Sequence, residues 1–331
     1  MTDRFMDYEN DLEAQPTFED ALEELKTDDE SMPSPALIVG LSDLSPEQLA
    51  QLGPVWEKLS HSYRRILMQM LVDATASNFM LNFQPIGRAT LTSHHADVRQ
   101  AAIELLFEDE STELLRVLLD IAVNDLAENV RAEATKSLGR FVLAGEMGDL
   151  DESLTDKVQD TLQTIIDNTQ EDMLVRRFAL ESLSNCTRDG LPQRIADAYK
   201  SNDSSMRLSA VVAMGRSCDD RWESEVLDEL SNTDDDMRLA AIQTAGELQL
   251  SSAVGQIIKN IEDGERAEQE IAIVALGEIG GKEAVRILQS LLDGAEQAED
   301  DALIELVDDA LGTASLVNGD FMMVDFTDLD D

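Results

Sequence analysis

Apolar residues recur at helical spacing along most of the chain, and the pattern repeats with a period close to 31 residues. The repeat is marked by an arginine and by an alanine three residues later. The arginines are Arg99, Arg131, Arg176, Arg207 and Arg238, at spacings of 32, 45, 31 and 31 residues, and Gln269 takes the next place. The alanines are Ala102, Ala134, Ala179, Ala210, Ala241 and Ala272. Apolar side chains four residues before and after each of the first five alanines form one stripe, which predicts a buried helix in these repeats.

A second apolar-periodic segment lies between each such helix and the next, for example over 112–124 and 220–232. Each repeat is therefore expected to be an antiparallel helical hairpin. One hairpin cannot bury both of its faces, so the hairpins must stack. The sequence predicts an all-α fold, an α-solenoid of about eight stacked HEAT-like hairpins and no strand. The pairs are expected at roughly 45–76, 79–107, 112–142, 153–186, 190–217, 220–249, 251–279 and 282–313.

Small and polar residues at fixed places refine this prediction. The alanines and the glycines that follow the stripe are expected to let neighbouring helices approach closely, or to mark a helix end. The glycines are Gly139, Gly215, Gly246 and Gly277, and the candidate caps are Asp97, Asn129, Asp172, Ser204 or Ser205, and Asp235 or Asp236. The step of 45 residues indicates an insertion near 143–156 that bends the stack or presents a loop.

Composition suggests four regions. Residues 1–35 carry a net charge of −10 and are expected to be a mostly disordered acidic arm, in which Phe18, Ala21, Leu22 and Leu25 could form a short helix on an apolar surface. Residues 36–94 are expected to be degenerate, capping helical pairs, and 95–313 the repeats themselves. Residues 314–331 form an acidic-hydrophobic tail with the composition of a segment that folds as it binds.

The segments Asp97-Val-Arg-x-x-Ala102, Asn129-Val-Arg followed by Leu-Gly139, and Asp236-Met-Arg-x-Ala-Ala followed by Gly246 resemble HEAT repeats. Their short period is similar to that of the HEAT-like repeats of phycobilisome lyases. The resemblance covers about 95–313 and, more weakly, 45–94. It implies a helical solenoid that serves as a scaffold, adaptor, transport receptor or assembly factor. Deoxyhypusine hydroxylases, a di-iron branch of the family, carry His-Glu pairs, whereas none of His61, His94 and His95 is followed by Glu.

Charge restricts the partners. The 331 residues carry a net charge of −44, which would repel a nucleic-acid backbone. We find no apolar run of membrane-spanning length, and the first residues lack the pattern of a signal peptide. Cys186 and Cys218 cannot make a disulfide framework, which favours a reducing compartment. The expected protein is soluble and cytoplasmic, without nucleic-acid or membrane partners and with an undetermined oligomeric state.

No residue pattern points to an enzyme. His94, His95 and Asp97 are the one cluster of metal-ligand types, but a polar turn capped by Asp97 explains them better. Neither cysteine has an adjacent histidine, and phosphate-binding, zinc-protease and serine-nucleophile motifs are missing. We therefore expect no catalytic residue, no cofactor and no metal site.

The repeat arginines could form an anion ladder, but an arginine fixed in the first turn of a helix is more simply explained by pairing with acids such as Asp203 or Asp234. The predicted second helices carry nine basic and nine acidic residues over 97–107, 128–142, 172–186, 204–217 and 235–249. In HEAT proteins these helices line the concave face, which would then be neutral in an acidic chain. We place a partner-binding surface there, against the alternative of an ordinary solvated face. The candidate residues are Lys136, Arg140, Arg177, Val212, Arg216 and Val274, with Phe321 and Phe326 in the tail.

The favoured function is a non-enzymatic scaffold or adaptor that binds other proteins, preferably through their basic surfaces. One alternative is an accessory subunit of a modifying enzyme such as a lyase-type complex. A second is that the charge adapts the protein to high salt, because only seven of its 25 basic residues are lysine. The tail could dock on a partner, on the chain's own concave face, or over the last repeat.

Overall fold

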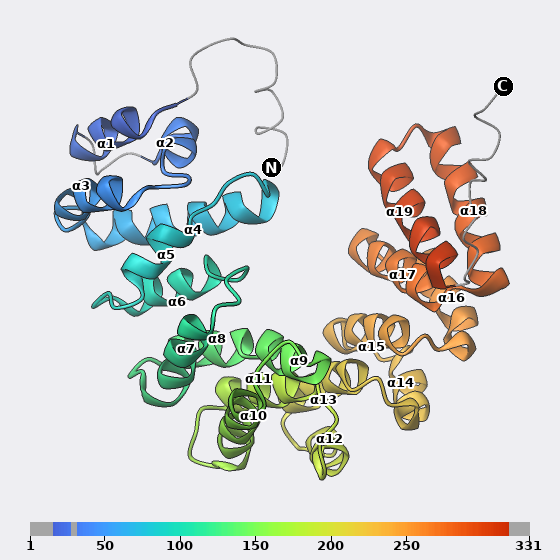
Figure 1. Cartoon of the computed structure of the whole chain (residues 1–331). Helices are drawn as coiled ribbons and strands as arrows, with labels where there is room; N and C mark the ends of the chain where they lie inside the picture. Colours follow the sequence, from blue (N-terminus) through green and yellow to red (C-terminus); the bar gives the residue numbers. More distant parts are fainter. Residues whose placement is uncertain (1–15, 28–31, 318–331) are drawn as a thin grey trace, which may run out of the picture. The chain divides into compact units, whose positions relative to one another are not determined.

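The computed structural model describes residues 16–27 and 32–317, and in these ranges the chain is helical and has no strand (Figure 1). It divides into two compact units, residues 1–138 and 139–331. The described part of each unit is a stack of helical hairpins, so the predicted all-α solenoid of stacked hairpins is confirmed. The acidic-hydrophobic residues 318–331, including Phe321 and Phe326, lie outside the described residues.

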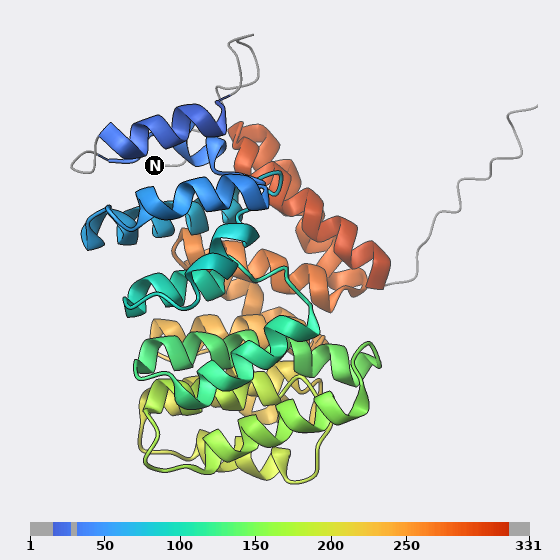
Figure 2. The same ribbon diagram turned by 60° about the vertical axis from the view of Figure 1, so that its left-hand side comes forward.

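The first unit contains the first three expected hairpins and an additional pair before them. Its helices are α1 (Phe18–Thr27), α2 (Pro35–Gly40), α3 (Pro46–Trp56), α4 (His61–Ser77), α5 (Gln84–Thr90), α6 (Ala96–Glu104), α7 (Thr112–Asn124) and α8 (Glu128–Ser137). The second helices of consecutive hairpins contact one another, α4 with α6 and α6 with α8. Figure 2 shows the helices of this unit, blue to green, as successive layers.

Helix α1 is the short helix that the sequence analysis allowed within residues 1–35. The four apolar residues of the predicted short helix, Phe18, Ala21, Leu22 and Leu25, are all buried in it. Helices α2 and α3 supply the apolar surface that α1 needs. A Cβ atom on Gly40 of α2 would lie 2.9 Å from the Cβ atom of Ala21, so the missing side chain permits this contact.

The second unit contains the other five hairpins, preceded by an additional helix. Its helices are α9 (Gly139–Met147), α10 (Glu152–Asp167), α11 (Met173–Leu183), α12 (Leu191–Tyr199), α13 (Ser204–Arg216), η2 (Asp220–Trp222), α14 (Glu223–Glu229), α15 (Asp235–Glu247), η3 (Ser251–Ala253), α16 (Val254–Asp263), α17 (Arg266–Ile279), α18 (Gly281–Ala298) and α19 (Asp301–Val317). The second helices α11, α13, α15, α17 and α19 contact one another in that order. They lie on the inner side of the curve of this unit (Figure 1).

The insertion predicted near 143–156 is not a loop. Residues 139–147 form α9, residues 152–167 form α10, and only 148–151 connect them. The predicted single helix 128–142 is likewise interrupted, because α8 ends before Leu138 and the boundary between the two units follows that residue. Helix α9 packs against α10 and α11, so the insertion adds a helix to the second unit.

The repeat alanines lie where the second helices stack. All six have no exposed surface, and Leu67 and Val307, which replace the alanine in the first and last pairs, are also fully buried. A Cβ atom on Gly246 would lie 2.9 Å from Cα of Ala275, and one on Gly277 would lie 2.8 Å from the carbonyl oxygen of Ala310. Small residues thus allow the second helices to approach to backbone contact, which larger side chains would prevent.

Candidate protein-binding surface

The repeat arginines form hydrogen bonds within their own hairpins. In four repeats Nη1 donates to the backbone carbonyl six residues earlier, near the end of the first helix or in the turn. The bonds run from Arg99 to Ser93, from Arg131 to Asp125, from Arg207 to Ser201 and from Arg238 to Asn232, at 2.7 to 2.9 Å. A carbonyl at a helix end has no intrahelical partner, and the guanidinium supplies one. The repeat arginine therefore has a structural role, because it stabilises the turn of its own hairpin.

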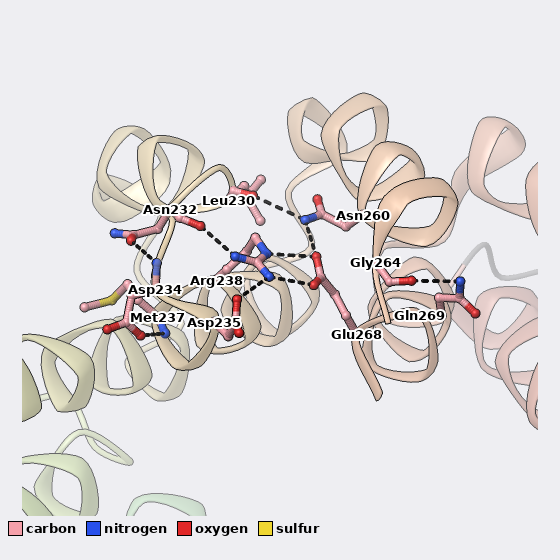
Figure 3. Close-up of polar contacts among 10 residues, drawn as sticks. All are labelled: Leu230, Asn232, Asp234, Asp235, Met237, Arg238, Asn260, Gly264, Glu268 and Gln269. Atoms are coloured by element: carbon pink, nitrogen blue, oxygen red, sulfur yellow. Dashed lines mark hydrogen bonds and ion pairs between the residues drawn. The ribbon is translucent and has the colours of Figure 1, made fainter. Parts of the chain in front are cut away.

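Two of these arginines also form a bidentate ion pair with a carboxylate. Arg99 donates Nε and Nη2 to Asp125 at 2.8 and 2.7 Å. Arg238 donates Nε and Nη2 to Glu268 of the next repeat at 2.9 and 2.8 Å (Figure 3). Asn260 donates to the same carboxylate at 2.7 Å, and these hydrogen bonds hold the pKa of Glu268 below its ordinary value.

The acids expected to pair with the arginines have another role. Asp203 and Asp234 are the N-caps of α13 and α15 and accept hydrogen bonds from the amides of Met206 and Met237 at 2.9 and 3.1 Å. The predicted pairing of repeat arginines with acids of their own or an adjacent repeat is made by Asp125 and Glu268, and no ion pair of the described residues joins a repeat arginine to Asp203 or Asp234. A side-chain oxygen at an N-cap satisfies a free backbone amide, and the predicted caps of these two helices were placed one or two residues too late.

Of the other predicted N-caps, one is confirmed and two are not. Asp172 caps α11, as expected, by accepting from the amide of Leu174 at 2.8 Å. Asp97 and Asn129 do not occupy the N-cap position, because α6 and α8 begin one or two residues earlier. Asn129 instead donates to the side chain of Gln100 on α6 at 2.7 Å.

The side of the second helices that faces away from the buried repeat alanines is the candidate surface of the second unit. On each helix, positions one, five and nine residues after the repeat arginine or Gln269 share a face, since they are four residues apart. Position five is two residues from the buried alanine, about 200° around the helix. We call these positions on α11, α13, α15 and α17 the inner surface. They are Arg177, Glu181 and Asn185; Leu208, Val212 and Arg216; Leu239, Gln243 and Glu247; and Glu270, Val274 and Glu278.

Two of the expected partner-binding arginines are held by the chain itself. Arg177 donates Nε to the Ser209 hydroxyl at 2.8 Å, and this hydroxyl donates to Glu181 at 2.5 Å. Arg216 lies 3.8 Å from the other oxygen of the Glu181 carboxylate. Glu181 is buried, and its carboxylate is paired with Arg216 and is linked to Arg177 through the Ser209 hydroxyl. These arginines stabilise the stacking of α11 and α13, a role that the sequence did not indicate.

The other residues that were expected to bind a partner lie on different helices. Lys136 is exposed on α8 in the first unit, with its Nζ 3.6 Å from the Glu133 carboxylate. Arg140 lies on α9, and its guanidinium carbon is 4.8 Å from the centroid of the Phe141 ring. Val212 is half-buried on α13, and Val274 is 45% exposed on α17. Only Arg177, Val212, Arg216 and Val274 share the inner surface.

Carboxylates dominate the C-terminal part of the inner surface, which the sequence analysis missed. Desolvation raises the pKa of Glu247 on α15, and both desolvation and the nearby Glu247 charge raise the pKa of Glu278 on α17. Glu247 lies over Gly215, and Glu278 lies over Gly246. The glycine of one repeat thus makes room for the glutamate of the next. The signal was present in the self-alignment, because each glutamate directly follows its own repeat glycine.

The chain's three histidines gather in the first unit without forming a metal site. His61 and Asp97 share a hydrogen bond of 2.9 Å, and the His61 ring stacks on His95 with centroids 3.8 Å apart. No group of three metal-ligand side chains that could hold an ion occurs among residues 16–27 and 32–317. Within the same ranges, no helix combines the length and the apolar character needed to cross a membrane. Cys186 is buried and Cys218 is exposed.

Comparison with protein families identifies residues 223–307 with the family model described as HEAT repeats. No curated protein matches the chain. The matching model is that of HEAT repeats in general, so the likeness to lyase-type repeats and the accessory-subunit alternative stay predictions.

Three solved structures are similar to the chain. YibA of E. coli is 15% identical with a TM-score of 0.43, over 84% of this chain and 95% of its own. A chain in a structure of Kap95p bound to RanGDP is 12% identical with a TM-score of 0.40, over 90% of this chain and 41% of its own. Importin beta is 16% identical with a TM-score of 0.39, over 90% of this chain and 37% of its own.

Proposed function

We propose that this HEAT-repeat protein is a non-enzymatic scaffold or adaptor that binds an element of a partner protein along its inner surface. The observation that carries the proposal is the exposure of Val274. It stands 45% exposed between Glu270 and Glu278 on the same face of α17. An exposed apolar side chain that is rimmed by carboxylates and continues into further apolar residues is typical of an interaction site.

The inner surface has further apolar residues on the neighbouring second helices. Leu208 and Val212 on α13 and Leu239 on α15 are half-buried at equivalent repeat positions. Together with Val274 they give apolar contacts on three consecutive helices, whose axes are about 8–10 Å apart. An extended segment or a helix of the partner that crosses the layer can use them in succession.

The charges of this surface favour a basic partner. Arg177 is engaged with Ser209 and Arg216 with Glu181, whereas Glu247 and Glu278 are desolvated carboxylates beside the apolar residues. A lysine or arginine of the partner that approaches Glu247 and Glu278 would offset their desolvation. The acidic residues 318–331, with Phe321 and Phe326, are proposed as a second contact for the same class of partner.

The test uses two matched valine substitutions in the full chain. Val274→Arg places a cation in the inner surface, and Val123→Arg places the same cation on α7 of the first unit, where the valine is 53% exposed. Cross-linked complexes captured from native lysate are compared by quantitative mass spectrometry, after circular dichroism has established that both variants fold. The captured partner is then titrated as a purified protein.

The proposal expects a partner that Val274→Arg loses and Val123→Arg retains. With purified components, Val274→Arg should weaken binding at least about tenfold, the effect of losing roughly 1.4 kcal/mol of binding free energy. An identical list of partners for both variants would remove the inner surface as the binding site.

A further inference from the structure

A pocket of ≈ 340 Å³ opens between the hairpins α10/α11 and α12/α13 of the second unit. It lies at the end of the stack where each hairpin turns, and residues of both turns line it. Its floor is apolar, because Leu180 is 1% and Met206 is 8% exposed. Two arginines, Arg176 and Arg194, line it as well. It is separate from the inner surface, so the inference below does not depend on the proposed function.

Arg176 departs from the hydrogen bond that the other repeat arginines make. The others donate Nη1 to the carbonyl six residues earlier, whereas Arg176 donates Nε to the carbonyl of Ile166, ten residues earlier, at 3.1 Å. The turn between α10 and α11 covers residues 168–172 and is as long as the turns 91–95 and 230–234, after which Arg99 and Arg238 make the usual bond. Among the described residues, the Arg176 side chain donates one hydrogen bond, from Nε, and its Nη1 and Nη2 have no protein partner.

The carboxylate of Asp167, which lines the pocket, is already engaged. Asp167 accepts a hydrogen bond from Arg194 Nη2 at 3.0 Å and one from Gln163 at 2.9 Å. The hydrogen bond from Arg194 holds the pKa of Asp167 below its ordinary value, with a smaller contribution from the charge of Arg176. Asp197, which also lines the pocket, is exposed and accepts from Gln193 at 2.8 Å. The two terminal nitrogens of Arg176 are thus left to a ligand.

A planar guanidinium with two free terminal nitrogens matches a carboxylate, which can accept two parallel hydrogen bonds. The apolar floor adds a requirement for an aliphatic or aromatic group next to that carboxylate. A volume at the lower end of the range for ligand pockets holds about two side chains. A phosphate dianion fits less well, since Asp167 and Asp197 repel two charges more strongly than one.

We propose that this pocket, with Arg176 as its anchor, binds a segment of a partner protein in which an aspartate or glutamate stands beside an apolar residue. The net charge of the chain opposes an acidic ligand at long range. Physiological salt screens that repulsion beyond about 8 Å, so the contact with Arg176 decides the binding.

The test follows the ¹³C-methyl NMR signals of Met173 and Met206, which both line the pocket, in the full chain. The probe is a blocked synthetic peptide with the sequence of residues 320–326, which has aspartates beside phenylalanines. The control peptide has both aspartates replaced by asparagine. Arg176→Gln removes the anchor, and Arg116→Gln on α7 removes the same charge from an exposed side chain of the first unit.

The proposal expects saturable shifts of both methyl signals with the aspartate peptide. Arg176→Gln and the asparagine peptide should each weaken binding about tenfold or more, as expected for losing a charge-assisted pair. Arg116→Gln should leave binding unchanged. Arg176→Lys, which keeps the charge but not the two-pronged geometry, provides a second variant and should also weaken binding. Absence of saturable shifts, or equal weakening by Arg176→Gln and Arg116→Gln, would overturn the proposal.

The chain itself contains a segment of this chemistry at 320–326, and one further variant separates the two sources. Asp320→Asn/Asp325→Asn in the full chain removes the carboxylates with which that segment would compete. Equal affinity of this variant and the wild type for the aspartate peptide supports a partner protein as the source. Tighter binding by the variant would show that the chain's own segment competes for the pocket, and would overturn the assignment to a partner.

Discussion

Arg238 on α15 and Glu268 on α17 form two parallel hydrogen bonds, at 2.9 and 2.8 Å, that join consecutive repeats. The carboxylate is 9% exposed and the guanidinium 20% exposed. Arg238 also donates to the carbonyl of Asn232 within its own hairpin. One side chain therefore fixes the turn of one repeat and its contact with the next.

Glu268→Gln should destabilise the second unit by about 3 kcal/mol, because removing the buried partner leaves the Arg238 guanidinium only the exposed Asp235 carboxylate. Trp222 reports this unit, and Trp56, the chain's other tryptophan, lies in the first. Urea unfolding followed by fluorescence in a Trp56→Phe background therefore isolates the transition of interest. Asp235→Asn is the matched control, because Asp235 pairs with the same arginine but is 81% exposed. It should cost less than about 1 kcal/mol. Equal losses in the two variants would contradict a special role for Glu268.

The stability supplied by Glu268 should depend on pH in a defined direction. Its pKa in the folded chain is below the ordinary value of 4.5, chiefly because of the hydrogen bond from Arg238. The contribution is therefore complete above the unfolded pKa and disappears as the pH falls through the lower folded pKa. The difference between wild type and Glu268→Gln should be constant from pH 7 to about 5 and shrink below 4.5. A difference that persists at low pH would assign the effect to packing rather than charge.

Glu247→Gln should have the opposite effect and stabilise the second unit at pH 7. Desolvation raises the pKa of Glu247 above 4.5, so its ionised form costs folding free energy at neutral pH. The penalty is present above the folded pKa and is lost as the pH falls towards the unfolded value. The gain from Glu247→Gln should therefore vanish near pH 4.5. Glu262→Gln on α16, an exposed position, controls for the loss of one negative charge.

Two helical glycines should respond oppositely to the same substitution. Gly277→Ala should destabilise the second unit by about 1–3 kcal/mol, because the new Cβ atom would meet the backbone of Ala310 on α19 at 2.8 Å. Gly294→Ala on α18 has open space around it and should stabilise the unit by about 0.5–1 kcal/mol through helix propensity. Chemical unfolding of the two variants checks both signs. A gain in stability for Gly277→Ala would contradict the close approach of α17 and α19.

The two cysteines should differ in reactivity. Burial raises the pKa of the Cys186 thiol to about 11, whereas Cys218 is exposed. A thiol reagent at pH 8 should modify Cys218 rapidly and Cys186 at least about 100-fold more slowly, because the thiolate is the reacting form. Cys218→Ser should abolish the rapid phase. Two equally fast thiols would show that Cys186 is accessible.

Several features of the fold could be predicted from the sequence because they depend on local periodicity. Each of the eight expected hairpins has a counterpart, and each repeat alanine is fully buried. The N-caps of α13 and α15 are Asp203 and Asp234, and the sequence placed them too late. Several adjacent polar residues compete for the cap, and only backbone geometry selects one. The division after Leu138 was also missed, since an inserted helix and an inserted loop give similar repeat spacings.

The sequence by itself determined the all-α class, the hairpin repeat and the stripe of small residues on which the second helices stack. These features follow from spacings within about 31 residues, where the helical period fixes which side chains share a face. The tertiary structure decided which charged side chains are paired with other groups of the same chain. Arg216 meets Glu181, and Arg177 meets Ser209, only because α11 and α13 stack, and Arg176 reaches the carbonyl of Ile166 instead of the one six residues earlier. Charge pairing depends on distances between side chains of different helices, and a sequence pattern does not contain those distances.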